Sequence, residues 1–127
     1  MNLVDSSAWL EYFADGPNAK AFSGAIEDLD HLLVPSLCLL EVFKKVLVQK
    51  GETEALEKVA QMHQGKIVDL DATIAINAAK LGFTLKLPLA DSVILATARM
   101  HEAVLWTQDG DFEGMEGVKY FPKAKSK

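Results

Sequence analysis

Short apolar segments alternate with longer stretches of helical periodicity along this chain, and this alternation limits the possible folds more than any other feature. Strand-like runs occupy residues 2–4, 31–35, 66–68, 103–107 and 118–121. Helices are expected at about 37–50, 53–63, 71–83 and 90–102, and the two dozen residues between the first two strands also look helical. Strands separated by helical crossovers pair in parallel. The sequence therefore predicts an α/β layer fold with a central, mostly parallel sheet flanked by helices.

Local signals agree with these segments. Pro35 and Ser36 form a plausible helix start, Gly51 a helix end, and Pro88 a second helix start. The 127 residues, half of them hydrophobic, have the length and apolar content of one ordinary globular domain. We expect a single domain over residues 1–127, with a short basic tail from about residue 122.

Composition indicates a soluble, cytoplasmic protein without a membrane partner. No run approaches the roughly 20 apolar residues of a membrane span, and the first residues lack the basic and long apolar regions of a secretory signal. The single cysteine, Cys38, lies in the apolar run LCLL and is expected to be a buried structural thiol. One cysteine also excludes a thiol-based zinc cluster.

The charge balance argues against binding of nucleic acid by bulk electrostatics. Eighteen acidic and 13 basic side chains give a formal net charge of −5. A nucleic-acid substrate would need metal ions or local lysines. Lysines occur at Lys44 and Lys45, at Lys80 and Lys86, and in the terminal PKAKSK, although each group is more typical of solvated surface or a fraying terminus.

Acidic residues follow the predicted strands or lie on the helices next to them. Asp5 comes directly after the first strand, Glu41 lies on the helix after the second, and Asp91 opens the helix before the fourth. Asp109 and Asp111 follow that fourth strand. In parallel α/β sheets, ligands bind beyond the carboxyl ends of the strands. These acids are therefore candidates for one shared site.

Each acid also has an ordinary structural explanation. Glu41 has Lys44 and Lys45 three and four residues later, which suits a surface ion pair. The apolar stripe of its helix leaves Glu41 at the edge, facing either solvent or a cleft; that stripe is Leu39, Val42, Phe43, Val46 and Leu47. Periodicity does not choose between the two.

The four aspartates have local explanations of the same kind. Asp5 could cap a helix that begins near Ser6, and Asp91 could be a cap or a first-turn acid. Asp109 and Asp111 flank a glycine in a probable turn, where aspartates often bond their own backbone. A single site explains all of the acids together. Grouped carboxylates without histidines or thiolates favour Mg²⁺ or Mn²⁺ and disfavour zinc.

Other functional patterns are missing from the sequence. His31, His63 and His101 share no metal-ligand spacing, and no dinucleotide, P-loop, hydrolase-elbow or HExxH motif is present. The loop from Asp109 resembles the start of an EF-hand, but its twelfth position is Tyr120 instead of glutamate. Divalent metals held by carboxylates, with no protein nucleophile, fit phosphodiester hydrolysis by a metal-activated water.

Four blocks, in their order and spacing, resemble the PIN-domain ribonucleases, and more narrowly the VapC-type toxins of toxin–antitoxin pairs. They are LVDSSAWLEYF, PSLCLLEVFKK, LPLADSVILATA and LWTQDGDF, and they extend from Asp5 to about Phe112. The resemblance implies a PIN-like three-layer fold. It implies that the metal-binding and catalytic acids are Asp5, Glu41, Asp91 and Asp109, with Asp111 as an additional acid and Ser6 and Thr107 as supporting hydroxyl residues.

The resemblance further implies Mg²⁺- or Mn²⁺-dependent endonucleolytic cleavage of RNA and inhibition by a cognate antitoxin that also binds DNA. A homodimer is expected, with Trp9 and Phe13 as candidate exposed apolar residues that would equally suit the core. Two alternatives are open. One is a non-catalytic interaction protein that retains the PIN-like fold. The other, a phosphatase or receiver-like domain, is weakened because no paired acids follow the first strand.

Overall fold

The structure, a computed structural model, describes residues 1–124 and contains a five-stranded sheet in which every neighbouring pair is parallel. The strand order is β3-β2-β1-β4-β5. The strands are β1 (Asn2–Val4), β2 (Leu32–Pro35), β3 (Lys66–Val68), β4 (Val104–Thr107) and β5 (Val118–Tyr120). The predicted α/β class is confirmed, and the sheet of the described residues is wholly parallel.

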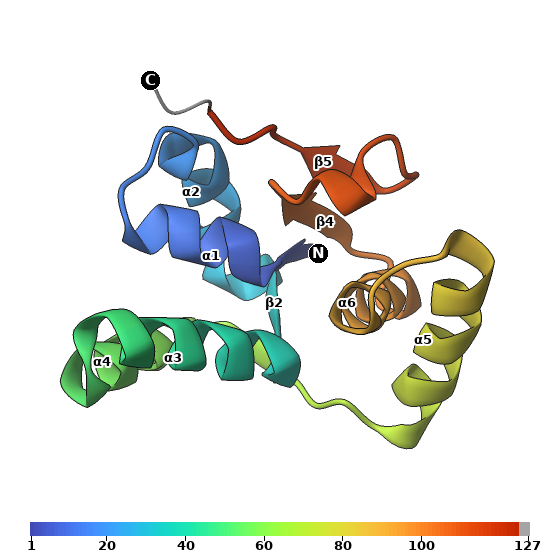
Figure 1. The fold of residues 1–127 in the computed structure, drawn as a ribbon, viewed down its shortest axis with the longest axis horizontal. Coiled ribbons are helices and arrows are strands. Elements are labelled where there is room, and N and C mark those ends of the chain that lie inside the picture. The colour runs from blue at the N-terminus through green and yellow to red at the C-terminus, as the bar shows by residue number, and fades with distance from the viewer. Residues whose placement is uncertain (125–127) are drawn as a thin grey trace.

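Six α-helices cover this sheet within the described residues. They are α1 (Ser6–Phe13), α2 (Ala19–Glu27), α3 (Ser36–Lys50), α4 (Glu52–Met62), α5 (Ala72–Leu85) and α6 (Leu89–Met100). Two short 3₁₀ turns, η1 (Leu29–His31) and η2 (Gly110–Phe112), complete the elements. His31 was expected to begin the second strand, but it belongs to η1. Figure 1 shows α1 to α4 on one side of the strands and α5 and α6 on the other, which right-handed parallel crossovers require.

Local capping explains where several helices begin and end. The side chains of Asp5 and Asp71 accept hydrogen bonds from backbone N–H groups in the first turns of α1 and α5. Gly51, with φ of +90°, ends α3 and turns the chain directly into α4. Pro35 and Pro88 immediately precede α3 and α6. The predicted helix boundaries are therefore correct to within a few residues.

The core contains most of the large apolar residues between the sheet and its helices. Trp9 is only 1% exposed and Phe13 packs partly buried against the core, so the interpretation of these two as exposed interface residues is wrong. Leu47, expected on the buried stripe of α3, is 40% exposed. Cys38 is fully buried, and burial raises the pKa of its thiol, as expected for a structural cysteine.

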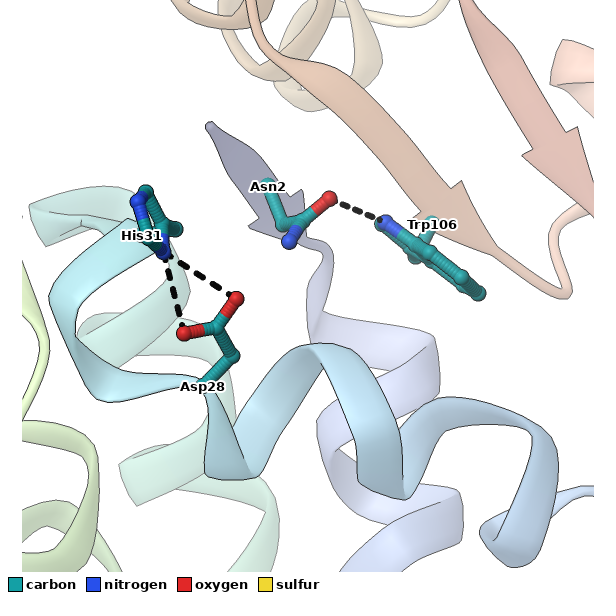
Figure 2. Close-up of polar contacts among 4 residues, drawn as sticks. All are labelled: Asn2, Asp28, His31 and Trp106. Atoms are coloured by element: carbon teal, nitrogen blue, oxygen red, sulfur yellow. Dashed lines mark hydrogen bonds and ion pairs between the residues drawn. The ribbon is translucent and has the colours of Figure 1, made fainter.

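Trp106 on β4 joins the first strand to the last described residues. Its indole Nε1 donates to the Asn2 side chain of β1 at 2.9 Å, as Figure 2 shows beside the separate, exposed Asp28–His31 contact. The Phe121 ring stacks on Trp106 with centroids 6.1 Å apart. This stacking places the segment after β5 against the sheet. Residues 125–127 of the predicted basic tail lie outside the described residues.

No single helix of the described residues is long and apolar enough to cross a membrane; α5 and α6, bent by 115° to each other, reach that length and hydropathy only when counted together.

Candidate metal centre

An open cleft of about 570 Å³ lies at the carboxyl edge of the sheet, and four of the acids predicted from the sequence line it. Asp5 reaches it from the junction of β1 and α1, and Glu41 from α3. Asp91 lies in the first turn of α6, and Asp109 follows β4. Four separate elements thus bring these carboxylates to one place, as parallel strand order requires.

Asp5 is almost completely buried and is held by three donors. Its Oδ1 accepts from the backbone N–H of Ala8 at 3.0 Å and from the Ser7 hydroxyl at 2.7 Å. Its Oδ2 accepts from the Thr107 hydroxyl at 2.5 Å. Asp5 is therefore a helix cap and a cleft residue at once, with both oxygens fixed in orientation.

The two hydroxyls that hold Asp5 are themselves held by the loop after β4. The Asp109 backbone N–H donates to Thr107 Oγ1 at 2.9 Å, and the Gln108 N–H donates to Ser7 Oγ at 3.3 Å. Each hydroxyl accepts one hydrogen bond from this loop and donates its own proton to Asp5. The loop that carries Asp109 is thereby locked to the junction that carries Asp5.

Asp91, Asp109 and Asp111 form the tightest acidic group of the described residues. One carboxylate oxygen from each lies within 4.8 Å of the others. Asp109 Oδ1 also accepts from the Asp111 backbone N–H at 2.9 Å, the local bond expected for an aspartate turn. The additional acid Asp111 therefore sits beside Asp91 and Asp109, although it does not line the cleft itself.

Burial and mutual repulsion disfavour ionisation of the two inner aspartates. Burial, opposed by its three hydrogen bonds, raises the pKa of Asp5 to about 6. Burial also raises the pKa of Asp91 to about 8, and a hydrogen bond to Asp111 and the charges of Asp109, Asp111 and Asp5 add to the rise. Without a cation, these carboxyls hold protons more tightly than exposed aspartates do.

Glu41 is oriented by Ser6 instead of by a lysine. Ser6 Oγ donates to Glu41 Oε1 at 2.7 Å, linking the start of α1 to α3. The ion pairs within residues 1–124 are Asp28 with His31 and Glu54 with Lys58, so the alternative for Glu41, a surface pair with Lys44 or Lys45, is not formed. The sequence left Glu41 facing either solvent or a cleft. In the structure it lines the cleft.

The donor set fits a hard divalent cation. All candidate ligands are carboxylate oxygens, and no histidine or cysteine of the described chain belongs to the group. Clustered carboxylates with raised pKa values are stabilised when a cation neutralises them. Asp91, Asp109 and Asp111 offer the closest oxygens, and Asp5 lines the same cleft as Asp91 and Asp109. Mg²⁺ and Mn²⁺ prefer oxygen ligands of this kind.

The sequence did not single out two polar residues of the cleft, Ser7 and Gln108, and it favoured solvated surface or a fraying terminus for two lysines that line it. Ser7 and Gln108 hold Asp5 and its neighbouring loop, and Lys45 and Lys123 line the cleft with the acids. A serine two residues after a capping aspartate gives a weak signal for Ser7. The positions of Gln108 and of Pro122, the residue before Lys123, depend on contacts with residues about a hundred positions away.

Comparisons with known proteins agree with this fold. Residues 3–118 match the PIN domain family, and no curated protein matches the sequence. Similar solved structures include a toxin–antitoxin complex from Klebsiella pneumoniae, with TM-score 0.75 and 25% identity, covering 94% of this chain and 96% of that chain.

Two further structures share the fold at lower identity. DNA-bound VapBC from Salmonella typhimurium has a TM-score of 0.73 at 16% identity, covering 96% of this chain and 98% of that chain. VapC20 of Mycobacterium tuberculosis, described as a sarcin–ricin loop cleaving toxin, has a TM-score of 0.71 at 16% identity, covering 88% and 92%. With its family match extending over most of its length, this chain belongs to the PIN domain family.

Proposed function

We propose that this protein is a Mg²⁺- or Mn²⁺-dependent endoribonuclease and the toxin component of a VapBC-type toxin–antitoxin system. The observation that carries the proposal is the convergence of Asp5, Glu41, Asp91 and Asp109 on one cleft, with Asp111 beside two of them. Membership of the PIN domain family supports it. So do the similar structures, which include a toxin–antitoxin complex, a DNA-bound VapBC and a toxin described as cleaving the sarcin–ricin loop.

The aspartates would hold the cation, and the chain supplies their orientation. Asp91, Asp109 and Asp111 are the closest donors, and Asp5 is fixed next to them by Ser7 and Thr107. A bound divalent cation supplies charge stabilisation for the phosphate and lowers the pKa of a water molecule that attacks phosphorus. No side chain is needed as a covalent nucleophile.

Glu41 has a different part in this proposal. Its Oε1 accepts from the Ser6 hydroxyl, which orients the carboxylate in the cleft that the other acids line. Its second oxygen is available to accept a proton from the attacking water or to bind a second cation. An uncharged isostere at position 41 would keep the Ser6 contact and lose both capacities.

We propose two protein partners as well, an antitoxin and a second copy of this chain. Four strongly exposed apolar side chains, on α3, on α5 and at the start of α6, are the candidate contacts for these partners, because a partner would remove their apolar surface from water. They are Leu40, Val48, Phe83 and Leu89, which are 60%, 78%, 88% and 85% exposed.

Analytical ultracentrifugation of the parent and of Phe83→Asp tests the dimer: a parent that sediments as a monomer at every concentration excludes it.

Cleavage of an RNA panel tests the proposed activity. The parent should cut RNA in Mg²⁺ or Mn²⁺ and not in excess chelator, while Asp5→Asn and Asp91→Asn should lose at least about 100-fold in rate. Asp30→Asn is the matched control, since Asp30 is exposed on η1 and outside the cleft. Circular dichroism checks that each variant folds.

The outcomes also separate the alternatives. Cleavage that persists in Asp5→Asn or Asp91→Asn rejects the assigned acids. Hydrolysis of a phosphomonoester but not of RNA points to a phosphatase, and a folded parent that neither cleaves RNA nor binds Mn²⁺ points to a non-catalytic interaction protein.

A further inference from the structure

The acidic cleft contains two lysines that the proposed chemistry does not use. Five carboxylates line the cleft, from the four candidate acids and Glu11, and the two ammonium groups belong to Lys45 and Lys123. A divalent cation neutralises only the acids that bind it. An RNA backbone that crosses this cleft therefore needs its own cationic partners for the phosphates next to the reacting one.

The sheet order places these two lysines on opposite sides of the acids. Strands β1 and β4, which lead to Asp5 and Asp109, are neighbours in the middle of the sheet. Lys45 is on α3, which follows β2 on one side, and Lys123 lies three residues beyond β5 on the other. An RNA backbone that runs along the carboxyl edge of the sheet would therefore pass one lysine before it reaches the acids and the other lysine after them.

The surface is hollowed in both directions from the cleft. A hollow of about 420 Å³ shares Ser7, Gln108, Asp109 and Lys123 with it and continues to Gly110, Tyr120 and Pro122. A second hollow, also of about 420 Å³, shares Glu41 and Lys45 with it and continues to Leu40, Lys44 and Val48. Lys123 thus lines the cleft and the first hollow, and Lys45 lines the cleft and the second; the cleft and these two hollows are together called the groove.

Residues 121–123, here called the rim segment, are fixed although they lie outside any strand or helix. The Phe121 backbone N–H donates to the Thr107 carbonyl at 2.9 Å, and the ring of Phe121 packs on Trp106 and edge-on to Phe22. The Asn18 side-chain amide donates to the Pro122 carbonyl at 3.0 Å. The backbone immediately before Lys123 is therefore held on the rim of the cleft.

Asn18 connects the rim segment to the candidate metal centre. Its Nδ2 also donates to Gln108 Oε1 at 3.1 Å, and Gln108 Nε2 donates to the Ser7 carbonyl at 3.4 Å. The backbone N–H of Asn18 donates to Glu11 Oε2 at 2.8 Å, which fixes the loop between α1 and α2. One asparagine thus sets the distance between Lys123 and the residues that orient Asp5.

We propose that Lys45 and Lys123 bind the RNA phosphates on either side of the phosphodiester that is hydrolysed, with Asn18 as the positioning residue for Lys123. This inference rests on the proposed function and names how its substrate lies in the cleft. A single-stranded RNA backbone runs along the groove, across the acids, from α3 to the rim segment. Arg99, at the end of α6, takes no part because it is not among the groove residues.

Steady-state cleavage of a short single-stranded RNA at several salt concentrations tests the inference. Lys45→Ala and Lys123→Ala should each raise KM about 5- to 10-fold and reduce the slope of log(kcat/KM) against log[salt] by about 0.7, the value for one phosphate contact on a single strand. Lys123→Arg should restore most of the loss. Lys80→Ala, an exposed lysine on α5 away from the groove, is the matched control.

A double-mutant cycle tests Asn18 separately. Asn18→Ala should raise KM in the parent but add little in the Lys123→Ala background, because it acts through that lysine. Equal effects in both backgrounds would reject the positioning role. If the parent cleaves RNA while Lys123→Ala and Lys45→Ala keep its KM and salt slope, this inference alone is wrong. A parent that cleaves no RNA overturns the proposed function together with this inference.

Discussion

Asp5 shows how one carboxylate can serve the fold and a polar site together. Its Oδ1 caps α1 through the Ala8 N–H, and both of its oxygens are oriented by hydroxyls from Ser7 and Thr107. An ionised carboxylate has about four lone-pair positions, so these bonds do not exhaust it. Capping and cation binding, which are alternatives for this residue in the sequence, are compatible in the structure.

Thr107→Val removes the hydroxyl of this buried residue and nearly keeps its shape, so it should show the effect of the hydroxyl alone. It leaves Asp5 Oδ2 and the Asp109 N–H without their partner, so we expect a loss of about 1–3 kcal/mol in the free energy of unfolding. We also expect a decrease of about 10- to 100-fold in RNA cleavage, because an orienting partner of a ligand is lost. Thr107→Ser keeps the hydroxyl and should retain both properties. Urea unfolding in chelator and cleavage assays provide the measurements; a stable, fully active Thr107→Val would contradict the role of Thr107.

The raised pKa values of Asp5 and Asp91 predict how metal-free stability depends on pH. Both carboxyls bind their protons more tightly when folded, with pKa values of about 6 and about 8 against 3.8 ordinarily. The contribution of these two carboxyls to the free energy of unfolding should therefore be fully present below about pH 4, and it should be lost as the pH rises through about 6 for Asp5 and about 8 for Asp91. Asp91→Asn should remove the part of this decrease between about pH 6 and 8. Urea unfolding in chelator across this range tests it, and an identical pH profile for parent and Asp91→Asn would refute the assignment.

At the scale of the elements, local signals predicted the helices well and their connections less well. Proline before α3 and α6 and glycine after α3 act within one turn, which is why these boundaries were predicted. The stretch between the first two strands divides into α1 and α2 at a turn in which Asp15 has a φ of +51° and Glu11 accepts from the Asn18 N–H. That contact, like the 3₁₀ turn that takes His31 out of β2, depends on geometry that periodicity does not contain.

Helices α5 and α6 approach each other closely at one glycine. A Cβ on Gly82 would lie 2.5 Å from Ser92 Oγ and 3.3 Å from Ser92 Cβ, whereas a Cβ on Gly24 of α2 would meet nothing within 4 Å. Gly82→Ala should therefore destabilise the protein by about 1–3 kcal/mol through overpacking. Gly24→Ala should stabilise it by about 0.5–1 kcal/mol through helix propensity. Thermal or urea unfolding compares the two; a stabilising Gly82→Ala would contradict the close packing.

Across the whole molecule, the position of the acids could be predicted because strand order determines which residues share an edge. Asp5, Glu41, Asp91 and Asp109 follow or flank buried strands, and the parallel sheet brings them to one cleft. The resemblance implied Ser6 and Thr107 as supporting hydroxyl residues, but the acid that each of them contacts could not be predicted in the same way. Ser6 replaces the neighbouring lysines at Glu41 across 35 positions of sequence, and Thr107 reaches Asp5 across 102. Such pairs are decided by tertiary packing, which no local pattern records.

The net charge of −5 acquires a simple explanation at this scale. An acidic protein can bind a polyanion if cations occupy its acidic centre and lysines flank it. The proposed function therefore depends on whether the carboxylates of Asp91, Asp109 and Asp111 hold a divalent cation that RNA cleavage requires.

Titration of Mn²⁺ into the metal-free parent and into Asp91→Asn, followed on the same samples by calorimetry and by RNA cleavage, tests this claim most directly. We expect cleavage by the parent to rise in step with the occupancy of its Mn²⁺ site, and chelator to abolish it. In Asp91→Asn, this site should be lost or should bind Mn²⁺ at least about 10-fold more weakly. Cleavage that is unaffected by chelator, or Mn²⁺ binding by Asp91→Asn with the affinity of the parent, would contradict it.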